Sequence, residues 1–300
     1  MAKNNEEENK ISDINYYSLT SENIAFTCKE QKKKEQKINK ISNFDGSYLA
    51  GLIEGDGYIT ITNQDRVIIG ITFNIKDKPL AYFILKKIGQ GTIVKRKSNS
   101  IELRFSAKKS LEYIVNITNG KFRTPKIDQM YRLINWLNHK HNLSIEKKGY
   151  DLTSLKSNAW LSGFIEADGH FYIRYSPSQV ACKFFLEQRL IYPKTGESYK
   201  NIMLKMANSL LAFLKIRDRL NIKNKYYIIK AENQTSIIEI INYLDKFSLI
   251  SSKYLDYLCW KKAFYFIKNK QYKIEGKEKI LYYKNQMNDK RIIFDWNHLK

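Results

Sequence analysis

The chain has 300 residues, of which 43% are hydrophobic, enough for one large core or two modest ones. No stretch approaches the roughly 18 uncharged apolar residues of a membrane span, and the first eight residues lack the apolar core of a signal peptide. We therefore expect no membrane partner. The 3 cysteines form no CxxC pair, which argues against a disulfide framework and a cysteine zinc site.

The charge balance indicates a polyanionic partner. Lysine and arginine number 52 against 30 acidic residues, a net charge of +22, which is more than an indifferent solvated surface would carry. Residues 1–40 hold eight lysines and seven acids, so the excess lies almost wholly downstream. Nucleic acid bound by the folded part of the chain is the first expectation.

The beginning of the chain differs in composition from the rest. Residues 1–43 are rich in Lys, Glu, Asn and Gln, with too few apolar positions to offset the entropy of ordering. They predict a mobile charged leader. Residues 48–53 then form a short apolar helical segment, which Gly55-Asp56-Gly57 ends before an alternating strand at 58–62.

The same helix, turn and strand unit returns at residues 159–174. Asp56 and Asp168 are 112 positions apart, which makes two domain-sized halves rather than a solenoid. Each half is predicted to run α-β-β-α-β-β-α, so the fold class is α+β with two pseudo-symmetric αββαββα halves. The expected divisions are a leader over 1–43, a first half over 44–138, a linker over 139–156, a second half over 157–267 and a basic tail over 268–300.

Elements within each half follow from the apolar periodicity. In the first half we expect strands at 58–63, 67–75 and 92–105, a helix at 80–88 and a closing helix at 127–137. In the second half we expect strands at 171–176, 182–187 and 226–231, a helix at 202–220 and a closing helix at 254–266.

Two segments carry the strongest chemical signal. Residues 49–57 read LAGLIEGDG and residues 161–169 read LSGFIEADG, and both closely resemble the LAGLIDADG motif of homing endonucleases and intron maturases. The resemblance covers roughly residues 45–267. Residues 122–126 and 251–257 look like the subgroup encoded in mitochondrial group I introns. The abundance of Lys, Ile, Asn, Tyr and Phe is typical of translation from an AT-rich genome, which fits an organelle. We expect the mitochondrion, with the chloroplast as the alternative.

This resemblance implies a monomer whose two halves form a saddle on double-stranded DNA. It implies a site-specific homing endonuclease that makes a double-strand break in a long site by Mg²⁺-dependent phosphodiester hydrolysis and so promotes intron mobility. The site would be asymmetric because the two halves differ in sequence. The alternative within the family is an RNA maturase that assists group I intron splicing without cutting DNA. It would bind intron RNA, and the basic tail after Lys268 is the candidate surface. A degenerate endonuclease that binds DNA as a regulator is a third possibility.

The motif also has a physical interpretation of its own. Small residues on one face of each helix let two such helices pack backbone to backbone. That packing brings Asp56 and Asp168 together, and two close carboxylates repel unless a proton or a cation lies between them. The matched small residues are Ala50, Gly51 and Gly55 in the first copy and Ser162, Gly163 and Ala167 in the second.

By the resemblance, Asp56 and Asp168 stand at the family's metal-binding and catalytic position, sharing two or three divalent ions. The carbonyls of Gly55 and Ala167 could complete the coordination shell of Mg²⁺, which prefers oxygen ligands. The acid two positions earlier is Glu54 in one copy and Glu166 in the other. The family name has Asp there, and the departure should matter little for the metal.

Weaker catalytic candidates lie outside the motifs. Lys126 and Lys253 occupy matching places before the closing helices, where a lysine could neutralise charge on phosphate. Gln188 resembles a polar residue near the family's active-site water, and Asp77 is its expected counterpart in the first half. No HExxH, GxxxxGK[ST] or GxGxxG motif occurs.

Base recognition should come from the sheets. Side chains alternate along a strand, so one face can pack on the core while the other enters a major groove. The candidate DNA-contacting residues on the exposed faces are Thr60, Thr62, Gln64, Arg66, Arg96, Arg104, Arg174 and Arg189.

Overall fold

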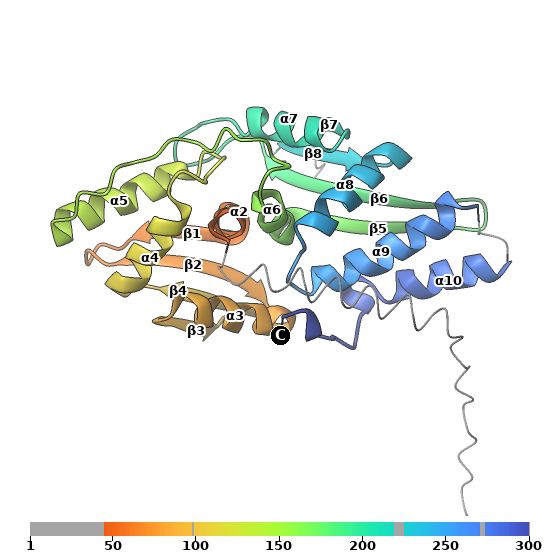
Figure 1. The fold of residues 1–300 in the computed structure, drawn as a ribbon, viewed down its shortest axis with the longest axis horizontal. Helices are drawn as coiled ribbons and strands as arrows, with labels where there is room; N and C mark the ends of the chain where they lie inside the picture. Colours follow the sequence, from red (N-terminus) through yellow and green to blue (C-terminus); the bar gives the residue numbers. More distant parts are fainter. Residues whose placement is uncertain (1–44, 98, 219–224, 271–273, 300) are drawn as a thin grey trace, which may run out of the picture. The chain divides into compact units, whose positions relative to one another are not determined.

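The computed structural model describes residues 45–97, 99–218, 225–270 and 274–299, and the expected leader lies outside these ranges. Two four-stranded antiparallel sheets dominate the described residues, with strand orders β1-β2-β4-β3 and β5-β6-β8-β7 (Figure 1). The order is the same in both sheets, as expected for a duplicated unit. The α+β class with two pseudo-symmetric halves is confirmed.

The first half follows its predicted elements closely. Asp45 caps the first helix by accepting a hydrogen bond from the Ser47 backbone N–H at 2.7 Å. Gly89 ends α3 with a φ of 76°, a backbone region that favours glycine. The elements are α2 (Gly46–Asp56), β1 (Gly57–Ile61), β2 (Val67–Asn74), the 3-10 turn η2 (Ile75–Asp77), α3 (Lys78–Ile88), β3 (Gly91–Lys95), β4 (Ser100–Phe105), α4 (Lys108–Thr118) and α5 (Ile127–His141).

The second half repeats this order and adds a C-terminal helix. Its motif helix again leads directly into a strand. The elements are α6 (Trp160–Asp168), β5 (Gly169–Tyr175), β6 (Val180–Arg189), α7 (Lys200–Ser209), β7 (Phe213–Asp218), β8 (Lys225–Ala231), α8 (Gln234–Lys246), α9 (Lys253–Lys268), α10 (Ile274–Asn285), and the 3-10 turns η3 (Asn288–Lys290) and η4 (Asn297–Leu299).

Two predicted elements were wrong. The single strand expected at 92–105 is a hairpin of β3 and β4, which turns near Asn99 at a φ of 53°. The helix expected at 202–220 ends at Ser209, where Leu211 has a φ of 49°, and the chain continues as β7. Pairing with β8 overrode helical propensity there, because β7 completes the hydrogen bonding of an otherwise unpaired strand edge.

One face of each sheet forms the core. Ile69, Ile71 and Leu103 of the first sheet are fully buried, as are Phe184 and Leu186 of the second. In Figure 1, α4 and α5 lie over the first sheet while α8 and α9 lie over the second. Helices α5, α8 and α9 pack against strands of their own half, and α4 packs against α2, α3 and α5. The opposite face of each sheet carries the polar alternate positions.

The region expected as a basic tail packs onto the second half. Ile280 of α10 and Met287 after it are buried, and α10 lies along α9. Arg291 forms a buried ion pair with Asp256 at 3.3 Å. None of the helices in the described part of the chain combines the length and apolar character that a membrane span requires.

Candidate active site

Helices α2 and α6 lie side by side between the two sheets and touch through their backbones. A Cβ added to Gly51 would lie 2.0 Å from the Trp160 carbonyl oxygen, and one added to Gly163 would lie 2.0 Å from that of Tyr48. A Cβ on Gly55 would lie 2.2 Å from the Ala167 Cβ. No side chain larger than hydrogen fits at these glycines, so the small residues of the motif set the distance between the helices.

This packing brings Asp56 and Asp168 to the same end of the helix pair. Each is the last residue of its helix, and each following glycine closes the turn by donating its N–H to the carbonyl of Ile53 or Ile165. Asp168 Oδ2 lies only 3.8 Å from the position a Gly55 Cβ would take. The predicted meeting of the two carboxylates at the helix ends therefore occurs in the structure.

The electrostatics of this pair fit a cation site. Loss of hydration, followed by the charge of Asp56, raises the pKa of Asp168 to about 7. Loss of hydration also raises the pKa of Asp56, although its side chain is open to solvent on one side. A nearby positive ion would stabilise the charged form of both acids. The open side of Asp56 is where a phosphate could approach.

Two lysines lie behind these carboxylates in matched geometry. Lys126 Nζ donates to the carbonyls of Gly55 at 2.7 Å and Gly57 at 2.9 Å. Lys253 Nζ donates to the carbonyls of Ala167 at 3.4 Å and Gly169 at 2.6 Å. Both predicted lysines thus lie at the two helix ends, and they share the Gly55 and Ala167 carbonyls that were expected to serve as metal ligands.

Burial lowers the pKa of both lysines, while neighbouring carboxylates counter that shift. The charges of Asp168, Glu54 and Asp56 raise the pKa of Lys126. The charges of Glu166 and both aspartates raise the pKa of Lys253 in the same way. The lysines are half-buried at the start of the closing helices α5 and α9. Each can therefore place positive charge near a phosphate that approaches the two aspartates.

The earlier acid of each motif has a role that sequence reasoning missed. Glu54 accepts hydrogen bonds from the backbone N–H groups of Arg123 and Thr124 and from Trp160 Nε1 at 2.5 Å. Burial raises the pKa of Glu54 to about 7 against these hydrogen bonds. Its carboxylate therefore joins its own helix to the segment before Lys126 and to the opposite motif helix.

Glu166 makes the equivalent connections in the second half. It accepts from the backbone N–H groups of Ile250 and Ser251 and, at 3.1 Å, from the Tyr48 hydroxyl of the opposite motif helix. The signal was available in the sequence, because Tyr48 and Trp160 have the same 112-residue spacing as the aspartates. Neither acid is a metal ligand in this arrangement, and both fix the lysine-bearing segments.

Gln188 lies beside Asp168 as expected, whereas Asp77 does not take the matching register position in the first half. Gln188 falls within β6, and its Nε2 donates to Asp168 Oδ2 at 3.2 Å. Gly57 pairs with Ile71 and Gly169 with Leu186, so the residue in the position of Gln188 is Phe73. The site is therefore asymmetric: Asp168 has an amide partner from its sheet, and the matching position of the other sheet holds an apolar residue.

Asp77, expected as that counterpart, binds the opposite half, and its charge also contributes to the raised pKa of Asp56. It ends η2, and its Oδ1 accepts the backbone N–H of Ser252 at 2.7 Å. That bond holds the start of α9 beside Lys253. Asp77 follows Phe73 by four residues, so it lies in the turn after β2 and not in the strand itself.

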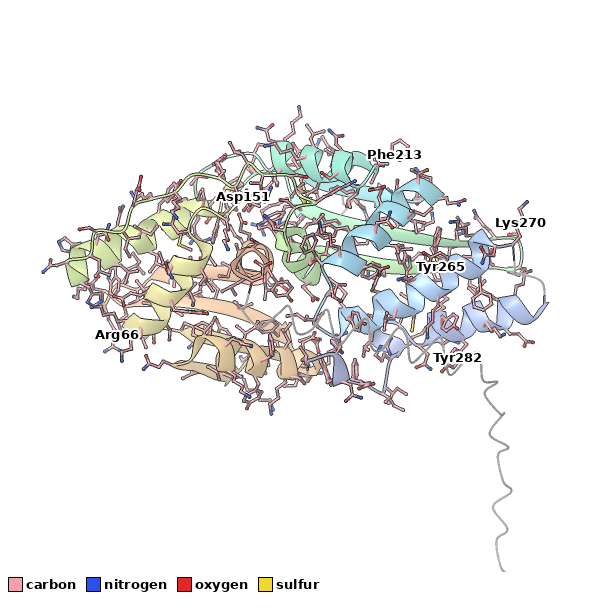
Figure 2. The ribbon with its side chains drawn as sticks, in the orientation of Figure 1. Arg66, Asp151, Phe213, Tyr265, Lys270 and Tyr282 are labelled. Carbon is pink, nitrogen blue, oxygen red and sulfur yellow. The ribbon has the colours of Figure 1, made fainter. Side chains whose placement is uncertain are left out.

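The predicted DNA-contacting residues separate into two groups. Thr62, Gln64 and Arg66 were expected on a strand face but lie in the turn between β1 and β2. Figure 2 shows Arg66 at the edge of the first half, away from the motif helices. The register favours the turn because Thr62 N–H already bonds the Arg66 carbonyl and closes the hairpin. The others lie on strands or directly after one, on the face opposite the core: Thr60, Arg96, Arg104, Arg174 and Arg189.

Within the described ranges, no group of three or more His, Cys, Asp and Glu side chains could hold a metal ion by itself. The two aspartates would need other oxygen ligands, which backbone carbonyls and substrate phosphates supply at Mg²⁺ sites. The donor set consists of hard oxygens and suits such an ion.

Comparison with known proteins places this geometry in a family. A model described as LAGLIDADG endonuclease matches residues 49–137 and 161–264. The chain is 31% identical to the intron-encoded DNA endonuclease aI3 of Saccharomyces cerevisiae, over 90% of this chain and 76% of that protein. It is also 32% identical to the intron-encoded RNA maturase bI4 of that yeast, over 54% of this chain and 24% of that protein.

Solved structures share the fold. The meganuclease I-SmaMI bound to uncleaveable DNA aligns with a TM-score of 0.65 and 19% identity, covering 83% of this chain and 100% of that one. I-SmaMI is also known bound to its uncleaved DNA target in the presence of calcium ions. With the family model matching both halves and the yeast endonuclease aligned along most of its length, this chain is a double-motif member of the LAGLIDADG endonuclease family.

Proposed function

We propose that this protein is a monomeric homing endonuclease that cuts both strands of a long, asymmetric DNA site and so spreads its host intron. The observation that carries the proposal is the pair of carboxylates, Asp56 and Asp168, held at one end of two helices in backbone contact. A protein that only bound DNA would not need to hold two repelling acids there. The mitochondrion is the proposed compartment, since the aligned yeast proteins are intron-encoded.

Asp56 and Asp168 would hold divalent ions, Mg²⁺ in the proposed reaction, with the carbonyls of Gly55 and Ala167 as further ligands. When bound, the metal supplies positive charge that offsets the negative charge developing on the scissile phosphate. Lys126 and Lys253 flank the site from the protein side and add to that stabilisation. Gln188 fixes the orientation of Asp168 through its hydrogen bond.

The direct test is Mg²⁺-dependent cleavage of a DNA library that contains the uninterrupted junction of the flanking exons. The full chain is compared with the double variant Asp56→Asn/Asp168→Asn. We expect one specific cut that the variant does not make. Salt-sensitive binding with no cut by the wild type would contradict the endonuclease assignment.

Acidic pH should weaken the metal site. The pKa of Asp168 is raised to about 7 by loss of hydration and by the charge of Asp56, so below pH 7 a proton competes with the cation. The Mg²⁺ concentration that gives half-maximal cleavage should rise about tenfold per pH unit below 7. It is measured between pH 5.5 and 8.5, with metal-free DNA binding as the control. A constant half-maximal concentration between pH 6 and 7 would contradict this reading.

A second candidate function, RNA maturation without DNA cleavage, is favoured by the outer surface of α9 and α10. Exposed tyrosines lie there among lysines, such as Tyr265 with Lys268 at 5.9 Å from its ring, and Tyr282 at 61% exposure (Figure 2). We name this surface, formed by Lys262, Tyr265, Lys268, Lys279 and Tyr282, the α9–α10 face. Aromatic rings and lysines together suit unpaired bases and phosphates.

Deleting the C-terminal region would not test this function cleanly, because Ile280 and Met287 belong to the core. The double variant Lys268→Glu/Lys279→Glu changes only the surface. If the α9–α10 face binds intron RNA, affinity should fall at least about tenfold, with a smaller salt dependence. Lys108→Glu/Lys109→Glu on α4 is the matched control. Equal RNA affinity in both variants would exclude the α9–α10 face as the RNA site.

A further inference from the structure

The polar face of the first sheet has an acid at its centre. In β4, Ile101, Leu103 and Phe105 point into the core, so Glu102 and Arg104 point the other way, toward the face proposed to meet DNA. An acid on that face should repel phosphate. Even so, the Glu102 side chain is only 2% exposed, because other side chains cover it.

Three side chains converge on this carboxylate. Arg104 Nε donates to Glu102 Oε2 at 2.9 Å, and Arg96 Nε donates to the same oxygen at 2.5 Å. The Tyr58 hydroxyl donates to Oε1. Burial by itself would raise the pKa of Glu102, but these hydrogen bonds outweigh it and hold the pKa below its usual value. The carboxylate is therefore charged and fully engaged.

A glycine in β2, Gly70, leaves room for this cluster. Tyr58 pairs across the strands with Gly70, and a Cβ on Gly70 would lie 2.5 Å from the Tyr58 ring. The missing side chain lets the ring lie flat against β2 and reach Glu102. Arg104 also pairs with Gly70. Glycine usually weakens a strand, and this close approach of the Tyr58 ring explains why Gly70 occurs here.

The arginines remain available to a ligand. Their side chains are 46% exposed for Arg96 and 30% for Arg104. Arg104 contacts Glu102 through Nε, and Arg96 through Nε and Nη2, so each guanidinium keeps terminal N–H groups for a ligand. Two adjacent N–H donors in a fixed plane match the O6 and N7 acceptors of guanine in the major groove.

The second half carries different residues at the matching register positions. By register, Ile228 stands in the place of Glu102, Lys230 in that of Arg104 and His170 in that of Tyr58. An acid occurs there on another strand: Glu187 pairs with Arg217 at 2.7 Å, with 53% of the arginine side chain exposed. Among the described residues, the second half therefore has an apolar side chain where the first half has Glu102.

We propose that Glu102 is a positioning residue for base recognition, holding Arg96 and Arg104 so that they read guanine-containing base pairs in the half-site under the first sheet. The proposal rests on the proposed DNA-binding function. An acid on a DNA-binding face would ordinarily be expected only to weaken binding by repelling phosphate. Removing the charge should harm discrimination instead of simply strengthening binding.

The test measures base preference with the full chain. Once the wild-type target is known, each base pair is varied and relative binding is measured for wild type, Glu102→Gln and Arg104→Ala. We expect Glu102→Gln to lose about 10- to 100-fold discrimination at the same positions as Arg104→Ala. Affinity for random DNA should stay level or rise, since a negative charge is lost. The double variant should be no less selective than Arg104→Ala alone.

Two further variants keep the test decisive. Glu112→Gln on α4 removes one acid elsewhere, from a pair with Lys108 at 3.6 Å, and should leave base preference unchanged. Tyr58→Phe removes one hydrogen bond to Glu102 but keeps the ring, so it should relax the same positions less and stands in if Glu102→Gln does not fold. Wild-type base preference retained in a folded Glu102→Gln protein, or in Tyr58→Phe if Glu102→Gln does not fold, would overturn the proposal. A wild-type protein with no base preference would instead refute the proposed function.

Discussion

Replacing either Asp56 or Asp168 with asparagine is expected to abolish double-strand cleavage, with a rate loss on the order of 1,000-fold or more. Asparagine keeps the volume but loses the charge that holds a divalent ion. The two carboxylates lie at the end of one helix pair, so Asp56→Asn also removes a charge that raises the pKa of Asp168. Cleavage is followed on the supercoiled target plasmid at saturating Mg²⁺.

DNA affinity gives the control for this prediction. Both variants should bind the target at least as tightly as wild type, because a negative charge beside the phosphates has been removed. Binding is measured in Ca²⁺, alongside thermal unfolding to show that the fold is intact. Full double-strand cleavage by either variant would show that its aspartate is not a metal ligand.

Adding a single methyl group at Gly51 or Gly163 is expected to destabilise the whole protein by at least about 3 kcal/mol. Alanine usually stabilises a helix relative to glycine by roughly 0.5–1 kcal/mol. Here the new Cβ would lie 2.0 Å from a backbone carbonyl of the opposite helix, so α2 and α6 must separate. Denaturant unfolding of Gly51→Ala and Gly163→Ala measures the effect.

Gly149 is the matched control. It lies between α5 and α6, and a Cβ there would meet no atom within 4 Å. Gly149→Ala should therefore change stability by no more than about 0.5 kcal/mol. If Gly51→Ala were as stable as Gly149→Ala, backbone contact between the motif helices would not be what joins the two halves.

The local elements and the centre of the site could be predicted because they depend on short-range patterns. Helix α2, its stop at Asp56 and strand β1 follow from apolar periodicity and from glycine placement. The 112-residue repeat predicted that Asp56 and Asp168 meet, since like segments pack in like ways. Lys126 and Lys253 were predicted from their matching places before the closing helices, and both do reach the ends of the motif helices.

Other features required the tertiary structure, because they depend on partners distant in the sequence. Residues 213–218 form a strand only because β8 offers an edge. Asp77 does not stand at the register position of Gln188, because strand register, which short-range patterns specify weakly, assigns that place to Phe73.

The acids show the division most clearly. The sequence by itself determined which four acids belong to the two motifs, because their spacing is local. Only the tertiary structure decided that Glu54 and Glu166 are buried beneath the lysine-bearing segments while Asp56 remains open to solvent. Likewise, Glu102 is one acid among 30 in the sequence. Its role depends on a pleat and a register that bring Tyr58, Arg96 and Arg104 to one carboxylate.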